Sequence, residues 1–232
     1  MTRFLEPGAR HLCLAFLVFA APLASCDFRS DDSKVAPDDP KSDFCRGVLV
    51  YSDEFSGPEI DAVHWSMEPD ARWSIEDGWL AGKPGNKNRA LWLSQPLPER
   101  VRVEFDARGG SVHGDLKVEV FGDGKAHESG YILIFGGWKN SLNVIARLDE
   151  HGKDRKSAPG AKVEKGKTYS MAVVRTGSHV RWYADREGKE LLMEYADASP
   201  LRGPGHDRFA FNNWDVPVFF DNVRVFDLES CP

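Results

Sequence analysis

Short segments in which apolar and polar residues alternate recur about every 10 to 15 residues from residue 47 onward. The clearest are RVRVEFDAR (100–108) and DLKVEVFG (115–122), in which every second residue is apolar. A period of two places successive side chains on opposite faces of an extended chain. This pattern predicts half-buried β-strands and is incompatible with amphipathic helices.

The same pattern extends over most of the chain, with turn residues between the segments. Further strands are predicted at 47–55, 73–82, 90–95, 130–137, 141–149, 168–177, 179–185, 189–197, 208–214 and 216–228. Within 73–82, Glu76-Asp77-Gly78 marks a hairpin turn. Residues 60–65 are the one helix-like segment, about one turn long. Strands without intervening helices predict an all-β fold, a sandwich of two antiparallel sheets.

The first 26 residues have the pattern of an export signal. Arg3 and Arg10 precede an apolar run, LCLAFLVFAAPLA (12–24), which is too short to span a bilayer comfortably. The run ends in Leu23-Ala24-Ser25-Cys26, which resembles the lipobox of bacterial lipoproteins. That resemblance implies a signal peptide at 1–25, lipidation of Cys26, and an anchor in the bacterial cell envelope, in the inner or the outer membrane. The alternatives are an ordinary secretory signal and a membrane anchor.

Residues 26–43 contain RSDDSKVAPDDPKSD, a polar stretch rich in Asp, Ser and Pro. It has no apolar periodicity, so we expect a disordered tether, with the folded domain at 44–232. The formal net charge of −6 and the lack of a basic stripe argue against a nucleic-acid partner. The membrane, through the lipid, is one expected partner, and the sequence does not indicate an oligomeric state.

Four cysteines are present in the chain. Cys13 leaves with the leader and Cys26 takes the lipid, which leaves Cys45 and Cys231 just outside the first and last predicted strands. Export places this pair in an oxidising compartment. We therefore predict a Cys45–Cys231 disulfide that joins the two ends of the domain. The alternative is two unpaired surface thiols.

The ends of the domain resemble a known family. LVYSDEFSGPEIDAVHW (49–65) resembles the opening of laminarinase-type family 16 glycoside hydrolases, and VFFDNVRVFDL (218–228) resembles their closing strand. Residues 73–82 and 100–108 look more like the wider concanavalin A-like superfamily. The resemblance implies that the predicted sandwich is a jelly roll.

The catalytic motif of those hydrolases, Glu-x-Asp-x-x-Glu, is not present. The nearest string runs from Glu104 to Gly109, with Gly in place of the last Glu, and Arg102 shares its polar face. We interpret that face as a solvated, charge-paired exterior, and Lys117-Val118-Glu119 in the same way. A non-catalytic carbohydrate-binding domain is therefore expected. The alternatives are a glycoside hydrolase-like enzyme with an unrecognised site and a structural or protein-interaction module of the envelope.

A calcium ion is a further implication of the resemblance, because the family holds a non-catalytic Ca²⁺ near its terminal strands. Glu54 and Asp221 stand at the matching positions. Calcium needs six to eight oxygen ligands, so backbone and water would have to complete the site. The alternative is that both carboxylates cap strand ends or pair with arginine. No cofactor is expected to be required.

Sugar recognition needs aromatic rings for the C–H faces of a pyranose and polar groups for its hydroxyls. Two clusters in the sequence combine a tryptophan with asparagines at a strand end or turn, where loops commonly carry function. The candidate ligand-binding residues are Trp138, Asn140, Asn143 and Arg147 in one cluster and Asn212, Asn213 and Trp214 in the other. The alternative is that each tryptophan is core and each asparagine is a turn residue.

Overall fold

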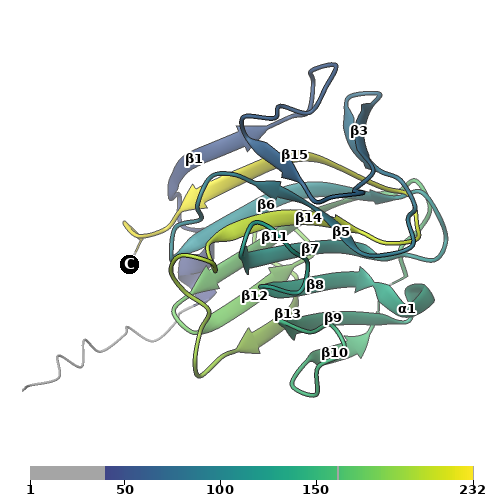
Figure 1. Cartoon of the computed structure of the whole chain (residues 1–232). Coiled ribbons are helices and arrows are strands. Elements are labelled where there is room, and N and C mark those ends of the chain that lie inside the picture. The colour runs from purple at the N-terminus through teal and green to yellow at the C-terminus, as the bar shows by residue number, and fades with distance from the viewer. Residues whose placement is uncertain (1–39, 161, 232) are drawn as a thin grey trace, which may run out of the picture. The chain divides into compact units, whose positions relative to one another are not determined.

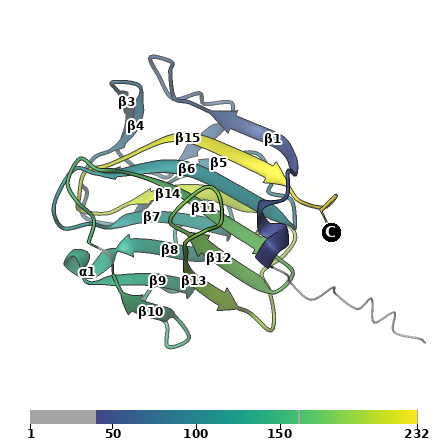
Figure 2. The ribbon, with the colours of Figure 1, turned by 180° about the vertical axis from the view of Figure 1, so that it is seen from behind.

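The computed structural model describes residues 40–160 and 162–231. The predicted leader, Cys26 and residues 26–39 lie outside this range. The described residues form two antiparallel sheets packed as a sandwich (Figures 1 and 2), which confirms the predicted all-β fold. Across this part of the chain, no helix is long and apolar enough to cross a membrane.

The first sheet contains both ends of the domain. Its strands follow the order β13 (Leu191–Ala196), β12 (His179–Tyr183), β11 (Thr168–Thr176), β6 (Val101–Gly109), β15 (Val218–Asp227), β4 (Trp79–Gly82) and β3 (Trp73–Glu76). β1 (Val48–Asp53) also pairs with β15, antiparallel, from Val48 opposite Asp227 to Asp53 opposite Val223. The opening and closing segments of the domain are therefore neighbouring strands.

The second sheet carries the surface on which the candidate site lies. Its order is β10 (Lys156–Pro159), β9 (Leu142–Arg147), β8 (Tyr131–Gly136), β7 (Leu116–Gly122), β14 (Arg208–Asn213), β5 (Arg89–Leu93) and β2 (Trp65–Met67). Neither β2 nor β10 was predicted. Each is only three or four residues long and is fixed by pairing with β5 or β9, so local alternation could not reveal it.

Alternation explains how the two sheets meet. In β7 the apolar residues Leu116, Val118 and Val120 are buried between the sheets, as the period-two pattern requires. The rings of Phe211 in β14 and Phe220 in β15 stack across the interface with their centroids 4.3 Å apart. The core therefore fills the space between the sheets, and the polar residues of both sheets face outward.

The outward face of the first sheet is charge-paired, but at Arg102 and Glu104 it is not solvated, which corrects the sequence interpretation. Arg102 Nε donates to Glu104 Oε1 at 2.8 Å, and both residues are buried. A 3₁₀ segment, η1 (Pro40–Phe44), accounts for part of this burial, since Arg102 Nη1 donates to the Asp43 carbonyl. Asp43 itself is fully buried, and its carboxylate accepts from Tyr183 at 2.7 Å. Residues 40–43, assigned to the tether from sequence, thus belong to the folded domain.

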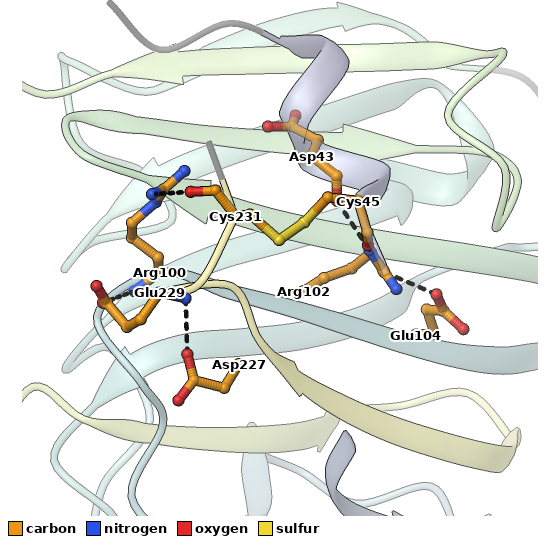
Figure 3. Close-up of a disulfide and its surroundings, with 8 residues drawn as sticks. All are labelled: Asp43, Cys45, Arg100, Arg102, Glu104, Asp227, Glu229 and Cys231. Atoms are coloured by element: carbon orange, nitrogen blue, oxygen red, sulfur yellow. Dashed lines mark hydrogen bonds and ion pairs between the residues drawn. A yellow bond between two sulfur atoms is a disulfide. The ribbon is translucent and has the colours of Figure 1, made fainter. Parts of the chain in front are cut away.

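The predicted disulfide is confirmed. Cys45 and Cys231 are bonded, with their Cα atoms 6.2 Å apart (Figure 3). Arg102 of β6 and Arg100, which directly precedes β6, donate to the backbone carbonyls of the two bonded cysteines. Arg102 Nη1 donates to the Cys45 carbonyl at 2.8 Å, and Arg100 Nη1 donates to the Cys231 carbonyl at 2.9 Å. The bond therefore joins the two ends of the domain where the first and last strands pair.

Candidate functional site

A cavity of about 550 Å³ lies on the outward face of the second sheet. Lys117 of β7 and Ile134 of β8 line it from the sheet, and segments near residues 87, 127 and 150 line it from the connecting loops. Ile134 is packed in an apolar cluster separate from the sandwich core, which places it on the outward face. Loops thus cover this face around a hollow, which is where ligand sites are common.

The loop at residues 123–130 is anchored to the second sheet by hydrogen bonds to a carboxylate of β7. Glu119, which has no exposed surface, points outward because it alternates with the core residues of β7. Its Oε1 accepts hydrogen bonds from the backbone amides of Ser129 at 2.8 Å and Gly130 at 2.7 Å. Its Oε2 lies 3.0 Å from His127 Nδ1. Glu119 therefore fixes both the loop and the imidazole that the loop carries.

His127 lines the cavity and has a buried ring nitrogen that makes no hydrogen bond within the described part of the chain. Its side chain is 9% exposed, and among the described residues Nε2 has no hydrogen-bond partner. Burial alone would lower the pKa of His127, but the carboxylates of Glu119 and Glu150 beside the ring outweigh it and raise the pKa to about 9. At neutral pH both ring nitrogens therefore carry protons. The Asn212 amide lies 2.7 Å from Nδ1, so a doubly protonated ring requires that amide to turn its oxygen toward it.

Glu150 is the carboxylate opposite Nε2. Its Oε2 lies 3.5 Å from His127 Nε2 and accepts from Lys117 Nζ at 2.8 Å. Asn88 braces the pair, since it accepts from Lys117 at 2.8 Å and donates to Glu150 Oε1 at 3.3 Å. Burial would raise the pKa of Glu150, but His127 and Lys117 lower it to about 2. Two further lining carboxyls, Glu68 and Asp115, have pKa values raised, chiefly by burial.

Two tryptophans from separate loops complete the lining. Trp138 follows β8 and is half-buried, with the Arg155 guanidinium 4.6 Å from its ring centroid. Trp214 follows β14 and is 45% exposed. The structure therefore brings one member of each predicted cluster to the same cavity, and Asn212 lies against His127 beneath them.

Trp138 lies in a strained turn. In α1 (Gly137–Asn140), Trp138, Lys139 and Asn140 have φ of 50°, 55° and 65°, a left-handed conformation that costs about 1–2 kcal/mol per non-glycine residue. Asn140 braces the turn, since its Nδ2 donates to the Val163 carbonyl at 2.8 Å and its Oδ1 accepts from the Val163 amide at 2.7 Å. Strain of this kind persists where surrounding contacts enforce it, often at ligand sites.

The other sequence candidates hold the scaffold and do not line the cavity. Asn143 accepts from the Gly136 amide at 3.1 Å, and Asn213 donates to the Lys83 carbonyl at 2.9 Å. Arg147 Nε donates to Asp197 Oδ2 at 2.8 Å. Sequence reasoning missed His127 and Glu150, which occupy loops without a motif. The available signal was the polar face of β7, because Lys117 and Glu119 contact Glu150 and His127. From the sequence alone, that face is interpreted as a solvated exterior.

The structure does not support the predicted calcium site. Nowhere in residues 40–160 and 162–231 do three or more His, Cys, Asp or Glu side chains gather so that they could hold a metal ion. Asp221, in β15 of the first sheet, accepts from the Asn222 amide at 2.7 Å. Its pKa is raised by burial and by the charges of Asp106 and Glu54. Asp106 is ion-paired with Arg186 at 2.8 Å, and Glu54 is exposed.

No protein-family model matches the chain, and no curated protein sequence is significantly similar to it. Solved structures do resemble it. A sialidase superposes with a TM-score of 0.59 at 16% identity, covering 78% of this chain, which spans only 19% of that sialidase. The carbohydrate-binding module CBM66 from Bacillus subtilis has a TM-score of 0.57 at 16% identity, covering 71% of this chain and 96% of the module.

A β-glucanase of Bacillus licheniformis superposes with a TM-score of 0.57 at 9% identity, covering 79% of this chain and all of the glucanase. These likenesses show that the sandwich is a jelly roll. At such low identities they show the fold alone.

Proposed function

We propose that the cavity binds a carbohydrate without cleaving it. The observation that carries the proposal is that Trp138 and Trp214 line the same cavity as His127, whose Nε2 makes no hydrogen bond within the described residues. The tryptophan rings suit the apolar C–H faces of a sugar, and the buried polar floor suits its hydroxyls. Structural similarity to a carbohydrate-binding module is consistent with this function.

The polar face of β7 favours binding over hydrolysis. Hydrolases of this fold place carboxylates on such a face, where one must reach the sugar. Glu119 has no exposed surface, and both of its oxygens accept hydrogen bonds from the covering loop. It therefore cannot contact a ligand unless the loop unfolds.

One observation favours the hydrolase alternative. Lys117 Nζ lies 4.0 Å from Asp115 Oδ1 and 2.8 Å from Glu150 Oε2, so these carboxyl oxygens are at most 6.8 Å apart, the sum of the two distances. Paired carboxyls at about 5–9.5 Å are the spacing of glycosidases. However, Lys117 is ion-paired with Glu150 and occupies the space beside both carboxyls. Release of reducing sugar from any glycan that the protein binds would establish this alternative.

Truncating either tryptophan tests the binding proposal. We expect Trp138→Ala and Trp214→Ala each to weaken glycan binding about tenfold or more, because each removes an aromatic face worth about 1–2 kcal/mol. A glycan array with the full chain identifies the ligand, and calorimetry measures the change. Trp79→Ala is the matched control, since Trp79 packs over Arg108 of the first sheet. If no glycan binds at millimolar concentration and none is cleaved, a structural or protein-interaction role replaces this proposal.

We also propose that the domain is displayed outside the cytoplasm on a lipid at Cys26. The support is the lipobox-like sequence, together with a disulfide that suits an oxidising compartment. Cys26→Ala should move the protein from the membrane fraction to the soluble fraction. Unchanged fractionation of that variant would count against the lipid anchor.

A further inference from the structure

The floor of the cavity presents a donor and an acceptor side by side. His127 Nε2 and Glu150 Oε2 lie 3.5 Å apart, both in side chains that line the cavity. Glu150 Oε2 accepts from Lys117 but, as a carboxylate oxygen, keeps a second acceptor position. The spacing is close to that of the oxygens of a vicinal diol. One hydroxyl can accept from Nε2–H while its neighbour donates to Oε2.

Three of the four cations that line the cavity, Arg89, Lys117 and His127, lie beside carboxylates. Lys117 bonds Glu150, and the ring of His127 bonds Glu119. Arg89 Nη1 lies 3.7 Å from Glu68 Oε2. At the floor, the charges of Lys117 and His127 are therefore matched by Glu150 and Glu119, and an incoming anion would approach these carboxylates. Burying a charge without a partner is costly, whereas a hydroxyl can both donate and accept.

The remaining charged residues of the lining do not add a net positive charge to the cavity. Lys87 is solvent-exposed, where ion pairing contributes little, and Glu128 is exposed as well. Together, the four lining carboxyls of Glu68, Asp115, Glu128 and Glu150 match the four cations Lys87, Arg89, Lys117 and His127. Glu119 then adds one carboxyl directly beneath His127.

We infer that the cavity selects an uncharged glycan, bound through vicinal hydroxyls between His127 and Glu150, and rejects glycans that carry uronic or sialic acids at this position. This inference rests on the proposed function. It adds a ligand class to it and names Glu150 as the residue that sets the selectivity.

The test uses the full chain and glycans matched except for charge. Methyl-esterified oligogalacturonides are compared with their de-esterified forms, and neutral lacto-oligosaccharides with their sialylated forms. Neutral gluco-, xylo-, manno- and fructo-oligosaccharides complete the array. Binding is expected among uncharged members, with the acidic member of a matched pair at least tenfold weaker.

The variant Glu150→Gln then tests whether Glu150 sets the selectivity for uncharged glycans. The substitution preserves shape, removes one negative charge and leaves Lys117 with only the more distant Asp115, at 4.0 Å, as a carboxylate partner among the described residues. We expect affinity for the uncharged ligand to fall several-fold and the ratio of uncharged to acidic affinity to fall about tenfold or more. Glu164→Gln is the matched control, because Glu164 is exposed and pairs only at the surface with Lys167. Circular dichroism establishes that the variants are folded. A second variant, His127→Gln, should also weaken binding of the uncharged ligand.

The outcomes separate the two proposals. Equal or tighter binding of the acidic member of each pair overturns the selectivity and leaves glycan binding standing. An unchanged affinity ratio in folded Glu150→Gln overturns the role of Glu150. Failure of every glycan to bind, charged or uncharged, overturns both the proposed function and this inference.

Discussion

Replacing Cys45 and Cys231 by serine should lower the free energy of unfolding by about 5 kcal/mol. The bond joins residues 186 apart in sequence, and closing so long a loop removes much of the conformational entropy of the unfolded chain. Urea denaturation of the oxidised protein and the double serine variant measures the difference. Because a typical domain is stable by only about 5–15 kcal/mol, the variant should be close to its unfolding threshold.

Two controls make this measurement specific. Wild-type protein treated with a thiol reductant should unfold at the same urea concentration as the double serine variant. Lys189→Ala breaks the exposed Lys189–Glu187 ion pair and should change the stability by less than about 0.5 kcal/mol. A loss below about 1 kcal/mol in the double serine variant would show that Asp43 and the β1–β15 pairing hold the ends together without the disulfide.

The strands of the sandwich could be predicted because their signal is local. Alternation in 100–108 and 115–122 sets which side chains face inward, and the structure places β6 and β7 there with Val103 and Val118 in the core. Segments fixed by distant partners gave no such signal. β10 contains Pro159 and no alternation, and η1 becomes ordered because Asp43 meets Arg181 and Tyr183 from strands far along the chain.

The candidate site could be predicted only in part, for the same reason. Trp138 and Trp214 stood out because tryptophan beside asparagine in a turn is an uncommon combination with a binding rationale. His127 and Glu150 come from different loops, and nothing in either loop indicates that folding brings them within 3.5 Å. Asn140 was predicted to contact a ligand, whereas the structure shows it bracing the turn that positions Trp138.

The free energy of unfolding should also fall by about 3 kcal/mol as the pH rises from 6.5 to 9. His127 titrates at about 6.5 when unfolded and at about 9 in the folded protein, because Glu119 and Glu150 stabilise its charged ring. A proton held more tightly by the folded state stabilises it fully below the unfolded pKa, and this contribution is lost as pH rises through the folded pKa. Each pKa unit is worth about 1.4 kcal/mol.

Urea denaturation at intervals from pH 6 to pH 9.5 measures this loss, and His127→Gln is the variant that isolates it. The variant should be less stable than the wild-type protein at pH 6. Its free energy of unfolding should change much less between pH 6 and pH 9.5. Glu150 has its pKa lowered to about 2, so its contribution is present above pH 4.5 and is lost in acid. An equally steep decline in His127→Gln would assign the pH dependence to other groups.

Glycan affinity should fall over the same pH range if the ligand contact proposed for His127 is correct. The Nδ1 proton is held by Glu119, so Nε2 is the nitrogen that loses its proton as the ring titrates. A deprotonated Nε2 can no longer donate to a sugar hydroxyl, and it places a second acceptor beside Glu150 Oε2. Stability and affinity should therefore titrate together near pH 9. An affinity that stays constant to pH 10 while stability falls would show that His127 supports the loop without contacting the ligand.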